Sequence, residues 1–343
     1  MTDNEKTILV FGATGAMGGA VVRRLLSDET SPWRVRAFMR DAAGPRAQAL
    51  AKNPRVELAI GDMADGETLR TTLAGTYGVF CNTDYWSAGS KAKEVALSKQ
   101  ILAACRDAAV QHVIYSSLEH CRRISGGKIP VPYFDSKAEV EEYIEVRRGE
   151  GDPWFREYVT VLVTAPYFEN FQGYFLPKPR TDADGHTVLV FSAPMADKPF
   201  PMAALDDIGW FAGYIFEEPQ QTAGRTLWIA SDRPTMQEAV QAFTRATGIP
   251  AEYHAVSLAE FREAERQGVQ SIKNSPDGDF VGNMFEFIQT CGIHRDFEAL
   301  RRIHPGLLTF EAWVRKTGWK GGPVSVQEYF DRHAEKTKAG DTK

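Results

Sequence analysis

A glycine-rich turn between a strand and a helix is the feature that most constrains the fold of this chain. Residues 8–26 read ILVFGATGAMGGAVVRRLL, in which a short apolar run ends at Gly12. Met17, Val21 and Leu25 then recur every four residues, which predicts the apolar face of a helix. A strand, a glycine turn and an amphipathic helix in this order are typical of the first segment of a doubly wound sheet.

The same alternation continues through the first half of the sequence. Apolar runs predict five more strands, over residues 35–39, 56–60, 77–82, 112–116 and 158–164. Helices are predicted between them, over residues 45–51, 67–73, 91–108 and 136–147. Strands that alternate with such helices favour a parallel sheet covered on both faces, and right-handed crossovers then give a doubly wound α/β fold.

The second half is less regular and mostly helical. Two further strands are predicted over residues 187–191 and 225–229. Helices are predicted over residues 206–216, 235–246, 259–267, 280–291, 297–303, 310–317 and 326–334. We therefore expect a first domain over residues 1–165 and a mixed region over 166–335, which returns strands to the sheet and forms a smaller, mostly helical domain. Residues 336–343 are expected to be a disordered tail.

Composition and charge narrow the class of protein. The 343 residues are 43% apolar and carry a net charge of -5, with no basic stripe for nucleic acid. The cysteines, at 81, 105, 121 and 291, lack metal-site spacing and are predicted to be buried free thiols in a reducing compartment. No apolar run approaches the ~18 residues of a membrane helix, and the polar start is unlike a signal peptide. We expect a cytoplasmic protein without membrane contact.

No metal site is predicted. His294 and Glu298 lie four residues apart, a spacing that would place them on one face if the segment were helical, but no third ligand accompanies them, so a salt-bridged surface helix is the better interpretation.

The glycines indicate a binding site for a phosphate group. Gly12, Gly15 and Gly18 spell G-x-x-G-x-x-G, a variant of the commoner G-x-G-x-x-G. Glycines let the backbone approach a pyrophosphate, and the helix that follows presents free N–H groups and its positive dipole end to the anion. The predicted dinucleotide contacts are Gly12, Thr14, Gly15, Ala16, Met17 and Gly18. A tight turn without a ligand is the alternative.

The end of the second strand indicates which nucleotide is bound. An acidic residue there favours NAD, whereas an arginine favours the 2′-phosphate of NADP. The strand ends VRAFMRD, which places Arg40 at this position and Asp41 directly after it. Because a guanidinium donates parallel hydrogen bonds to a phosphate, we predict NADP(H) as the cofactor. Asp41 keeps NAD as the alternative.

Two more strand ends contribute to the predicted site. Asp62 and the Met63 backbone follow the third strand, where they would face the adenine. Asn82 and Thr83 follow the fourth strand, where the cofactor would cross the sheet edge. Ligands of open parallel sheets bind at these carboxyl ends.

A tyrosine and a lysine form the predicted reactive centre. Tyr133 and Lys137 are a Y-x-x-x-K pair that follows the fifth strand. A free tyrosine has a pKa of about 10, and a lysine one helical turn away favours the phenolate. We predict that Tyr133 is the acid–base catalyst, that Lys137 tunes it and binds the nicotinamide ribose, and that Ser117 or Ser116 donates to the substrate carbonyl.

One pattern argues against this geometry. Ser136 and Glu139 form a capping box, S-x-x-E, which would start the helix at Ser136 and leave Tyr133 before it. Tyr133 would then be a wall aromatic, and Lys137 would only hold ribose. A second pair of the same spacing, Tyr174 with Lys178, contains a proline that disrupts a helix.

Taken together, these segments resemble the NmrA-like family of atypical short-chain dehydrogenases/reductases over about residues 6–330. The marks are FGATGAMGG, MR at the second strand, GDMAD, TDYW, YSSLEH, FDSKAEVEEY, APYFENF and PMAALDDIG. The resemblance implies an NADP-binding Rossmann fold with a small C-terminal domain that forms a cleft. It also implies that Lys137 contacts the cofactor and that Pro166, Tyr167 and Asn170 lie beside the nicotinamide.

The resemblance leaves the activity open between chemistry and sensing. Some members resemble reductases, while others sense the dinucleotide or regulate transcription and lack the tyrosine. The most similar branch includes an NADPH-sensing regulator with histidine where this chain has Tyr133, a difference that favours an enzyme.

We therefore predict an NADP(H)-dependent oxidoreductase that transfers hydride to a carbonyl, imine or activated double bond. Trp86, Tyr167 and Phe168 are candidates for a cleft lining that suits a hydrophobic or aromatic substrate, although core packing explains them equally well. The alternatives are a non-catalytic sensor with a protein partner and a non-redox enzyme that retains NADP. A homo-oligomer is also left open.

Overall fold

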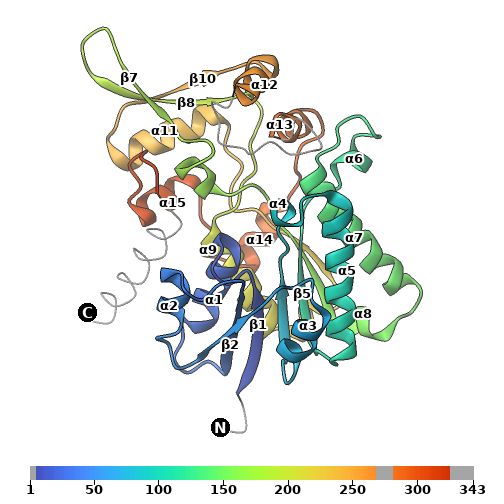
Figure 1. Cartoon of the computed structure of the whole chain (residues 1–343). Helices are drawn as coiled ribbons and strands as arrows, with labels where there is room; N and C mark the ends of the chain where they lie inside the picture. Colours follow the sequence, from blue (N-terminus) through green and yellow to red (C-terminus); the bar gives the residue numbers. More distant parts are fainter. Residues whose placement is uncertain (1–4, 268–280, 325–343) are drawn as a thin grey trace. The chain divides into compact units, whose positions relative to one another are not determined.

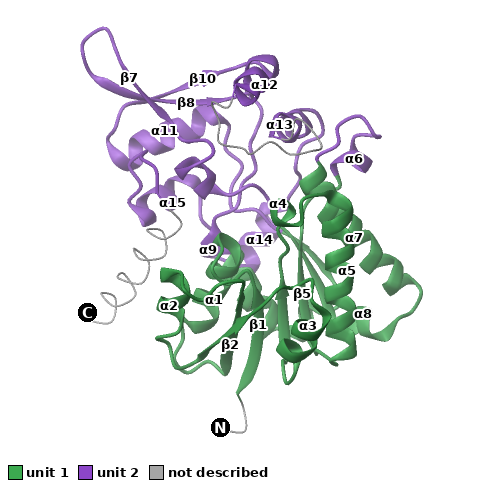
Figure 2. Ribbon diagram, viewed as in Figure 1, with its two compact units in different colours: residues 1–120, 132–164, 208–228 green, residues 121–131, 165–207, 229–343 purple. Residues whose placement is uncertain are grey.

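The structure is a computed structural model that describes residues 5–267 and 281–324. The chain divides into two compact units (Figure 2). The first unit comprises residues 1–120, 132–164 and 208–228, and the second comprises residues 121–131, 165–207 and 229–343. The predicted helix 326–334 and tail 336–343 lie outside the described residues, and a domain boundary near residue 165 stays a prediction.

The first unit is built on seven strands that pair in parallel, in the order β3-β2-β1-β4-β5-β6-β9. The strands are β1 (Lys6–Phe11), β2 (Trp33–Met39), β3 (Val56–Ile60), β4 (Gly78–Cys81), β5 (His112–Ser117), β6 (Val159–Val163) and β9 (Thr226–Trp228). This order confirms the predicted doubly wound α/β fold, and the predicted strand 225–229 does return to the sheet.

Helices cover both faces of this sheet (Figure 1). They are α1 (Ala16–Leu26), α2 (Pro45–Leu50), α3 (Gly66–Leu73), α4 (Tyr85–Ala88), α5 (Lys91–Asp107), α7 (Pro132–Gly149), α8 (Pro153–Tyr158), α9 (Leu205–Glu217) and α10 (Pro219–Thr222). Helices α3, α5, α7 and α8 share one buried apolar cluster with alternate residues of the strands, such as Leu9, Val79 and Val113. On the opposite face α9 packs on α1 so closely that a Cβ at Gly209 would lie 2.6 Å from the Ala20 carbonyl oxygen.

The helices of the first unit begin in two different ways. Asp65, Asp84, Ser90 and Asp152 each accept a hydrogen bond from a first-turn N–H of the helix that follows. Such caps satisfy N–H groups that have no partner inside the helix. In contrast, α1, α2 and α10 have no side-chain cap. The N-cap residue of α1 is Gly15, so no side chain at this position competes with an external acceptor for its first N–H groups.

The second unit is mostly helical, as predicted. Its helices are α6 (Cys121–Ile124), α11 (Met236–Thr247), α12 (Leu258–Arg266), α13 (Val281–Thr290), α14 (Phe297–Ile303) and α15 (Phe310–Thr317), with a 3-10 turn η1 (Phe168–Gln172). It also contains a separate three-stranded sheet of β7 (Lys178–Thr181), β8 (Thr187–Ala193) and β10 (Ala251–Ala255). The predicted strand 187–191 is therefore real, but it pairs with β7 and β10 rather than returning to the seven-stranded sheet.

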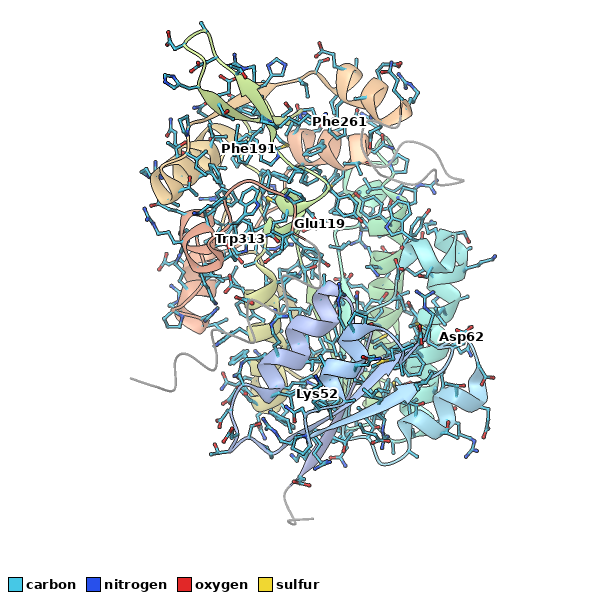
Figure 3. The ribbon with its side chains drawn as sticks, turned by 60° about the vertical axis from the view of Figure 1, so that its left-hand side comes forward. Lys52, Asp62, Glu119, Phe191, Phe261 and Trp313 are labelled. Carbon is cyan, nitrogen blue, oxygen red and sulfur yellow. The ribbon has the colours of Figure 1, made fainter. Side chains whose placement is uncertain are left out.

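An aromatic cluster forms the core of the second unit. Phe171, Phe191, Phe310, Trp313 and Trp319 are all buried, and Figure 3 labels Phe191 and Trp313. Their ring centroids lie 5.4 Å apart for Phe171 and Phe310 and 5.6 Å apart for the two tryptophans. Edge-to-face and tilted contacts of this kind add to the stabilisation from burial alone.

The structure bears on the predictions about the cysteines and about membrane helices. The cysteines are free thiols, of which those at positions 81, 105 and 121 are buried and Cys291 is half-buried. Burial raises the pKa of the Cys81 thiol to about 12. Among the described residues, no helix is both long and apolar enough to cross a bilayer.

Candidate functional site

The strand order places a switch point between β1 and β4. The chain runs from β1 outward to β2 and β3, then restarts at β4 and continues through β5 and β6 in the other direction. Open parallel sheets bind ligands outside the carboxyl ends of the strands at such a point. Gly12 follows β1 and Asn82 follows β4, so both residues lie at this edge.

The glycine turn has the geometry that brings backbone close to a ligand. Gly12 adopts a φ of 67°, a left-handed conformation that side chains disfavour. The Gly15 N–H donates to the Gly12 carbonyl oxygen at 2.8 Å, which closes the turn. A Cβ at Gly18 would lie 2.3 Å from that same oxygen, so only glycine lets α1 pack this closely on β1.

The start of α1 is suited to an anion. Its first turn contains no acidic residue, and its last turn contains Arg23 and Arg24. Thr14 and Ala16 are partly exposed at this start, whereas the Met17 side chain is buried and its sulfur accepts from the Ser116 hydroxyl at 3.3 Å. Met17 can therefore contact a nucleotide only through its backbone.

Arg40 and Arg46 are the first two basic side chains after β2. Arg40 is exposed, and the structure gives it no polar partner among the described residues. The Arg46 guanidinium donates to the Thr14 carbonyl oxygen of the glycine turn. Arg36 is engaged elsewhere, because it donates to Glu57 at 2.9 Å and to two backbone carbonyls at the C-terminal end of α3.

The acidic candidates at strands β2 and β3 stabilise local turns. The Asp41 carboxylate accepts from the Ala43 N–H at 2.8 Å. The Asp62 carboxylate, labelled in Figure 3, is exposed and accepts from the Ala64 N–H at 2.9 Å. Met63 is partly buried and packs against the apolar cluster of the sheet, so the side chains of Asp62 and Met63 point to different surroundings.

A buried polar cluster follows β4. The Lys137 ammonium donates to the Thr83 carbonyl oxygen at 2.7 Å and to a Glu94 carboxylate oxygen at 2.8 Å. The Thr83 hydroxyl donates to the same Glu94 oxygen at 2.8 Å, and the Ser136 hydroxyl donates to the other. Thr83 thus uses its carbonyl and its hydroxyl within the protein, while Asn82 is partly exposed.

Glu94 gives no sign of this role in the sequence. An acidic residue in the first turn of a helix usually lies at the surface and favours the helix dipole. Glu94 occupies that turn of α5 but is completely buried, because α7 covers it with Ser136 and Lys137. No local pattern signals this, since Lys137 is 43 residues away in the sequence.

Helix α7 brings Tyr133 and Lys137 onto one helical face. The helix begins at Pro132, a position where proline is favoured, and not at Ser136. The capping-box interpretation is therefore wrong: Ser136 lies inside the helix, where its hydroxyl donates to Glu94. Tyr133 and Lys137 are one turn apart, and this is the spacing that the predicted chemistry requires.

Aromatic rings surround Tyr133. The centroid of its ring lies 5.9 Å from that of Trp86 and 6.3 Å from that of Tyr85, both in α4. Tyr85 is buried, whereas Trp86 is 43% exposed and Tyr133 is partly exposed. We refer to Tyr85, Trp86 and Tyr133 as the aromatic shelf.

The two serines after β5 are less available than predicted. Ser117 is buried, and its hydroxyl donates to a Glu141 carboxylate oxygen at 2.7 Å. The Ser116 hydroxyl is directed to the Met17 sulfur. A role for Ser117 as a donor to substrate stays a prediction, and it requires the bond to Glu141 to be exchanged.

The remaining predicted residues lie in the second unit. Pro166 is buried, and its carbonyl oxygen accepts from the Ala203 N–H at 2.8 Å. Burial raises the pKa of Tyr167. The Asn170 carbonyl oxygen accepts from the Phe175 N–H at 2.8 Å. Their contacts to a nucleotide stay predictions.

Solved structures share this fold. A crystal structure of NmrA, a negative transcriptional regulator, in complex with NADP is 23% identical, with a TM-score of 0.69 over 92% of this chain and 95% of that chain. The Citrobacter sp. triphenylmethane reductase complexed with NADP(H) is 16% identical, with a TM-score of 0.68 over 91% of this chain and 99% of that chain.

Sequence similarity assigns the family. The NmrA-like family oxidoreductase notA of an Aspergillus species is 32% identical over 278 residues, which cover 74% of this chain and 77% of that protein. The model of the NmrA-like family matches residues 4–300. With the glycine turn, the uncapped α1 and the lysine of α7 at one edge of a doubly wound sheet, the chain belongs to the NmrA-like family.

Proposed function

We propose that this protein is an NADP(H)-dependent oxidoreductase. The observation that carries the proposal is the placement of Tyr133 and Lys137 on successive turns of α7, in the unit whose glycine turn precedes an uncapped helix. The names of relatives support it, since notA is described as an oxidoreductase and the Citrobacter reductase was solved with NADP(H).

The binding roles follow from the geometry of the first unit. The N–H groups at the start of α1 would hold the pyrophosphate, close to Gly12 and Gly15. Arg40, which is exposed at the end of β2, would bind the 2′-phosphate of NADP. Asp62 and Met63 would lie towards the adenine, and Asn82 and Lys137 towards the nicotinamide ribose.

The proposed chemistry couples hydride transfer to proton transfer. Bound NADPH would supply a hydride to a carbonyl, imine or activated double bond. The Tyr133 hydroxyl would donate a proton to the atom that gains the electron pair, and solvent would return that proton to the phenolate. Lys137 would orient the cofactor ribose rather than act on substrate.

The aromatic shelf favours a substrate with a planar aromatic group. Trp86 presents a large exposed ring beside Tyr133, at an interplanar angle of 33°. Offset stacking on such rings is favourable for aromatic ligands. A hydrophobic or aromatic substrate is therefore part of the proposal.

A second function, a redox sensor, is favoured by one observation. The charge of Lys137 is matched by Glu94, and the Ser117 hydroxyl is used by Glu141, so two of three predicted catalytic groups are engaged within the protein. A sensor would need only the nucleotide contacts. NmrA, whose fold is shared, is described as a regulator and was solved with NADP.

Calorimetric titration of NADPH, NADP+ and NADH, followed by turnover assays on aromatic carbonyls, imines and activated alkenes, tests the proposal. We expect NADPH to bind more tightly than NADH, and Tyr133→Phe to lower kcat by about 10²- to 10⁴-fold with the Kd for NADPH unchanged.

Tyr174→Phe is the matched control. Tyr174 begins the other Y-x-x-x-K pair and is 54% exposed in the second unit, so turnover should not change. If the Tyr133→Phe variant turns over as fast as wild type, Tyr133 is not the acid–base catalyst. Tight NADPH binding with no turnover across the substrate panel would support the sensor.

A further inference from the structure

A charged carboxylate lies in the core of the first unit. The Glu94 side chain has no exposed surface, and its partners Thr83, Ser136 and Lys137 are also buried, as is the adjoining Ser98. One Glu94 oxygen accepts from Lys137 and Thr83, both at 2.8 Å, and the other accepts from Ser136. Ser98 completes the cluster through the Thr83 hydroxyl at 3.2 Å.

Folding stability alone does not explain why such a cluster is buried. Removing two charges from water is costly, and a buried ion pair is often no more stable than apolar side chains of similar volume. The presence of Glu94 on α5 is better explained by its effect on Lys137, to which it is directly bonded.

Two short hydrogen bonds and one long contact hold the Lys137 ammonium. An ammonium group has three N–H donors. One is directed to the Thr83 carbonyl at 2.7 Å and one to Glu94 at 2.8 Å. The third meets only the Thr83 hydroxyl, at 3.4 Å, and is the contact that a ligand oxygen would most easily replace. The Lys137 side chain is 11% exposed, so it is anchored from inside the protein while part of it reaches the surface.

We propose that Glu94 is a positioning residue that anchors the Lys137 ammonium so that its third N–H, which has only the long contact to the Thr83 hydroxyl, is directed at the nicotinamide ribose. The inference rests on the proposed NADP(H) site and extends it to a residue that touches neither cofactor nor substrate. Because the Glu94 charge offsets that of Lys137, the pair acts as an oriented hydrogen-bond donor with no net charge.

The test compares two probes that differ in the nicotinamide half. NADPH contains the ribose that Lys137 would bind, whereas adenosine 2′,5′-bisphosphate contains only the adenosine half with its 2′-phosphate. We expect Glu94→Gln, which keeps the shape of the side chain, to weaken NADPH binding by about 10-fold or more. Binding of the bisphosphate should stay within about twofold of wild type.

Glu139→Gln is the matched control. Lys91 and Glu139 form another ion pair between α5 and α7, but both are partly exposed and Glu139 does not contact Lys137. If Glu94 only held the two helices together, both variants would act alike. We expect Glu139→Gln to bind both probes like wild type.

A double-mutant cycle separates positioning from a general structural effect. If Glu94 acts through Lys137, then adding Glu94→Gln to Lys137→Met will not weaken NADPH binding beyond Lys137→Met alone. Additive losses would overturn the inference, as would an unchanged affinity of Glu94→Gln for NADPH or an equal loss for both probes.

The variants also distinguish this inference from the proposed function. Wild-type protein that binds neither probe would overturn the NADP(H) site and the role of Glu94 with it. Wild-type protein that binds NADPH, with Glu94→Gln indistinguishable from it, would overturn only the role of Glu94. If Glu94→Gln does not fold, the double variant Glu94→Gln/Lys137→Met, which lacks both charges, replaces it and is compared with Lys137→Met.

Discussion

Arg40 is the side chain on which nucleotide choice depends in the proposed site. It is exposed at the end of β2, while the neighbouring Asp41 is bonded to its own turn. Hydrogen bonds to a charged phosphate contribute about 1.5–3 kcal/mol. We therefore expect Arg40→Ala to weaken NADPH binding by roughly 10- to 150-fold and to leave NADH binding unchanged.

Arg34→Ala is the control for this measurement. Arg34 lies in β2 as well, but its guanidinium donates to the Pro54 carbonyl oxygen at 3.0 Å. Its removal should alter neither affinity. If Arg40→Ala binds NADPH as tightly as wild type and Arg46→Ala binds it more weakly, the 2′-phosphate contact belongs to Arg46, which donates to the glycine turn.

Glu169 should make the stability of the protein depend on pH. Its carboxylate accepts from the Trp313 indole N–H at 2.9 Å and from the Leu205 N–H at the start of α9. Burial, with a contribution from Asp206, raises its pKa from 4.5 to about 8. Between these values the folded state keeps a proton that the unfolded state has lost, so stability falls as the pH rises through this window.

Glu169→Gln removes this titration. We expect the loss of unfolding free energy across the window to shrink by up to about 5 kcal/mol, since each pKa unit corresponds to about 1.4 kcal/mol, as measured by urea unfolding at several pH values. Glu298→Gln, which changes an exposed carboxylate of the same unit, should follow wild type. Parallel pH profiles for wild type and Glu169→Gln would show that Glu169 does not titrate in this range.

The packing of α1 on β1 depends more on Gly18 than on Gly15. A Cβ at Gly18 would lie 2.3 Å from the Gly12 carbonyl oxygen, whereas one at Gly15 would lie 3.1 Å from it. We expect Gly18→Ala to lower the free energy of unfolding by about 1–3 kcal/mol, as overpacking does, and Gly15→Ala to cost less. Gly66→Ala at the start of α3, where a Cβ meets nothing within 4 Å, is the control.

Sequence periodicity predicted the helices and strands of the first unit well, because each is formed by local pattern. Strand β3 has the predicted bounds, 56–60, and in the second unit helix α14 also has them, 297–303. The start of α7 was missed because S-x-x-E also occurs inside helices, and only the packing of Ser136 on Glu94 distinguishes the two cases.

Strands β7 and β10 had no signal in the sequence. Strand β7 is KPRT, four exposed residues with a proline, as suits an edge strand. Strand β10 is AEYHA, which is half-buried and becomes a strand through its parallel pairing with β8. Such long-range pairing leaves no periodic trace in a short segment.

Across the whole molecule, most predicted nucleotide contacts follow strands, since strand ends can be located from sequence. Gly12, Arg40, Asp62 and Asn82 all follow strands of the seven-stranded sheet, and their contacts to a nucleotide stay predictions. Glu94 and Ser98, which are buried beside Thr83, lie on a helix whose buried face is set by distant contacts. The sequence therefore indicated candidates at the strand ends and gave no sign of the buried polar cluster next to them.

The discontinuous first unit also affects synthesis of the chain on the ribosome. Strand β6 pairs with β9, yet residues 165–207 of the second unit are translated between them. Until Thr226–Trp228 emerge, the nascent sheet has an open edge at β6, whose five residues are all buried in the finished protein. An unpaired apolar strand edge favours aggregation, so the order of synthesis leaves this sheet edge open until its seventh strand is made.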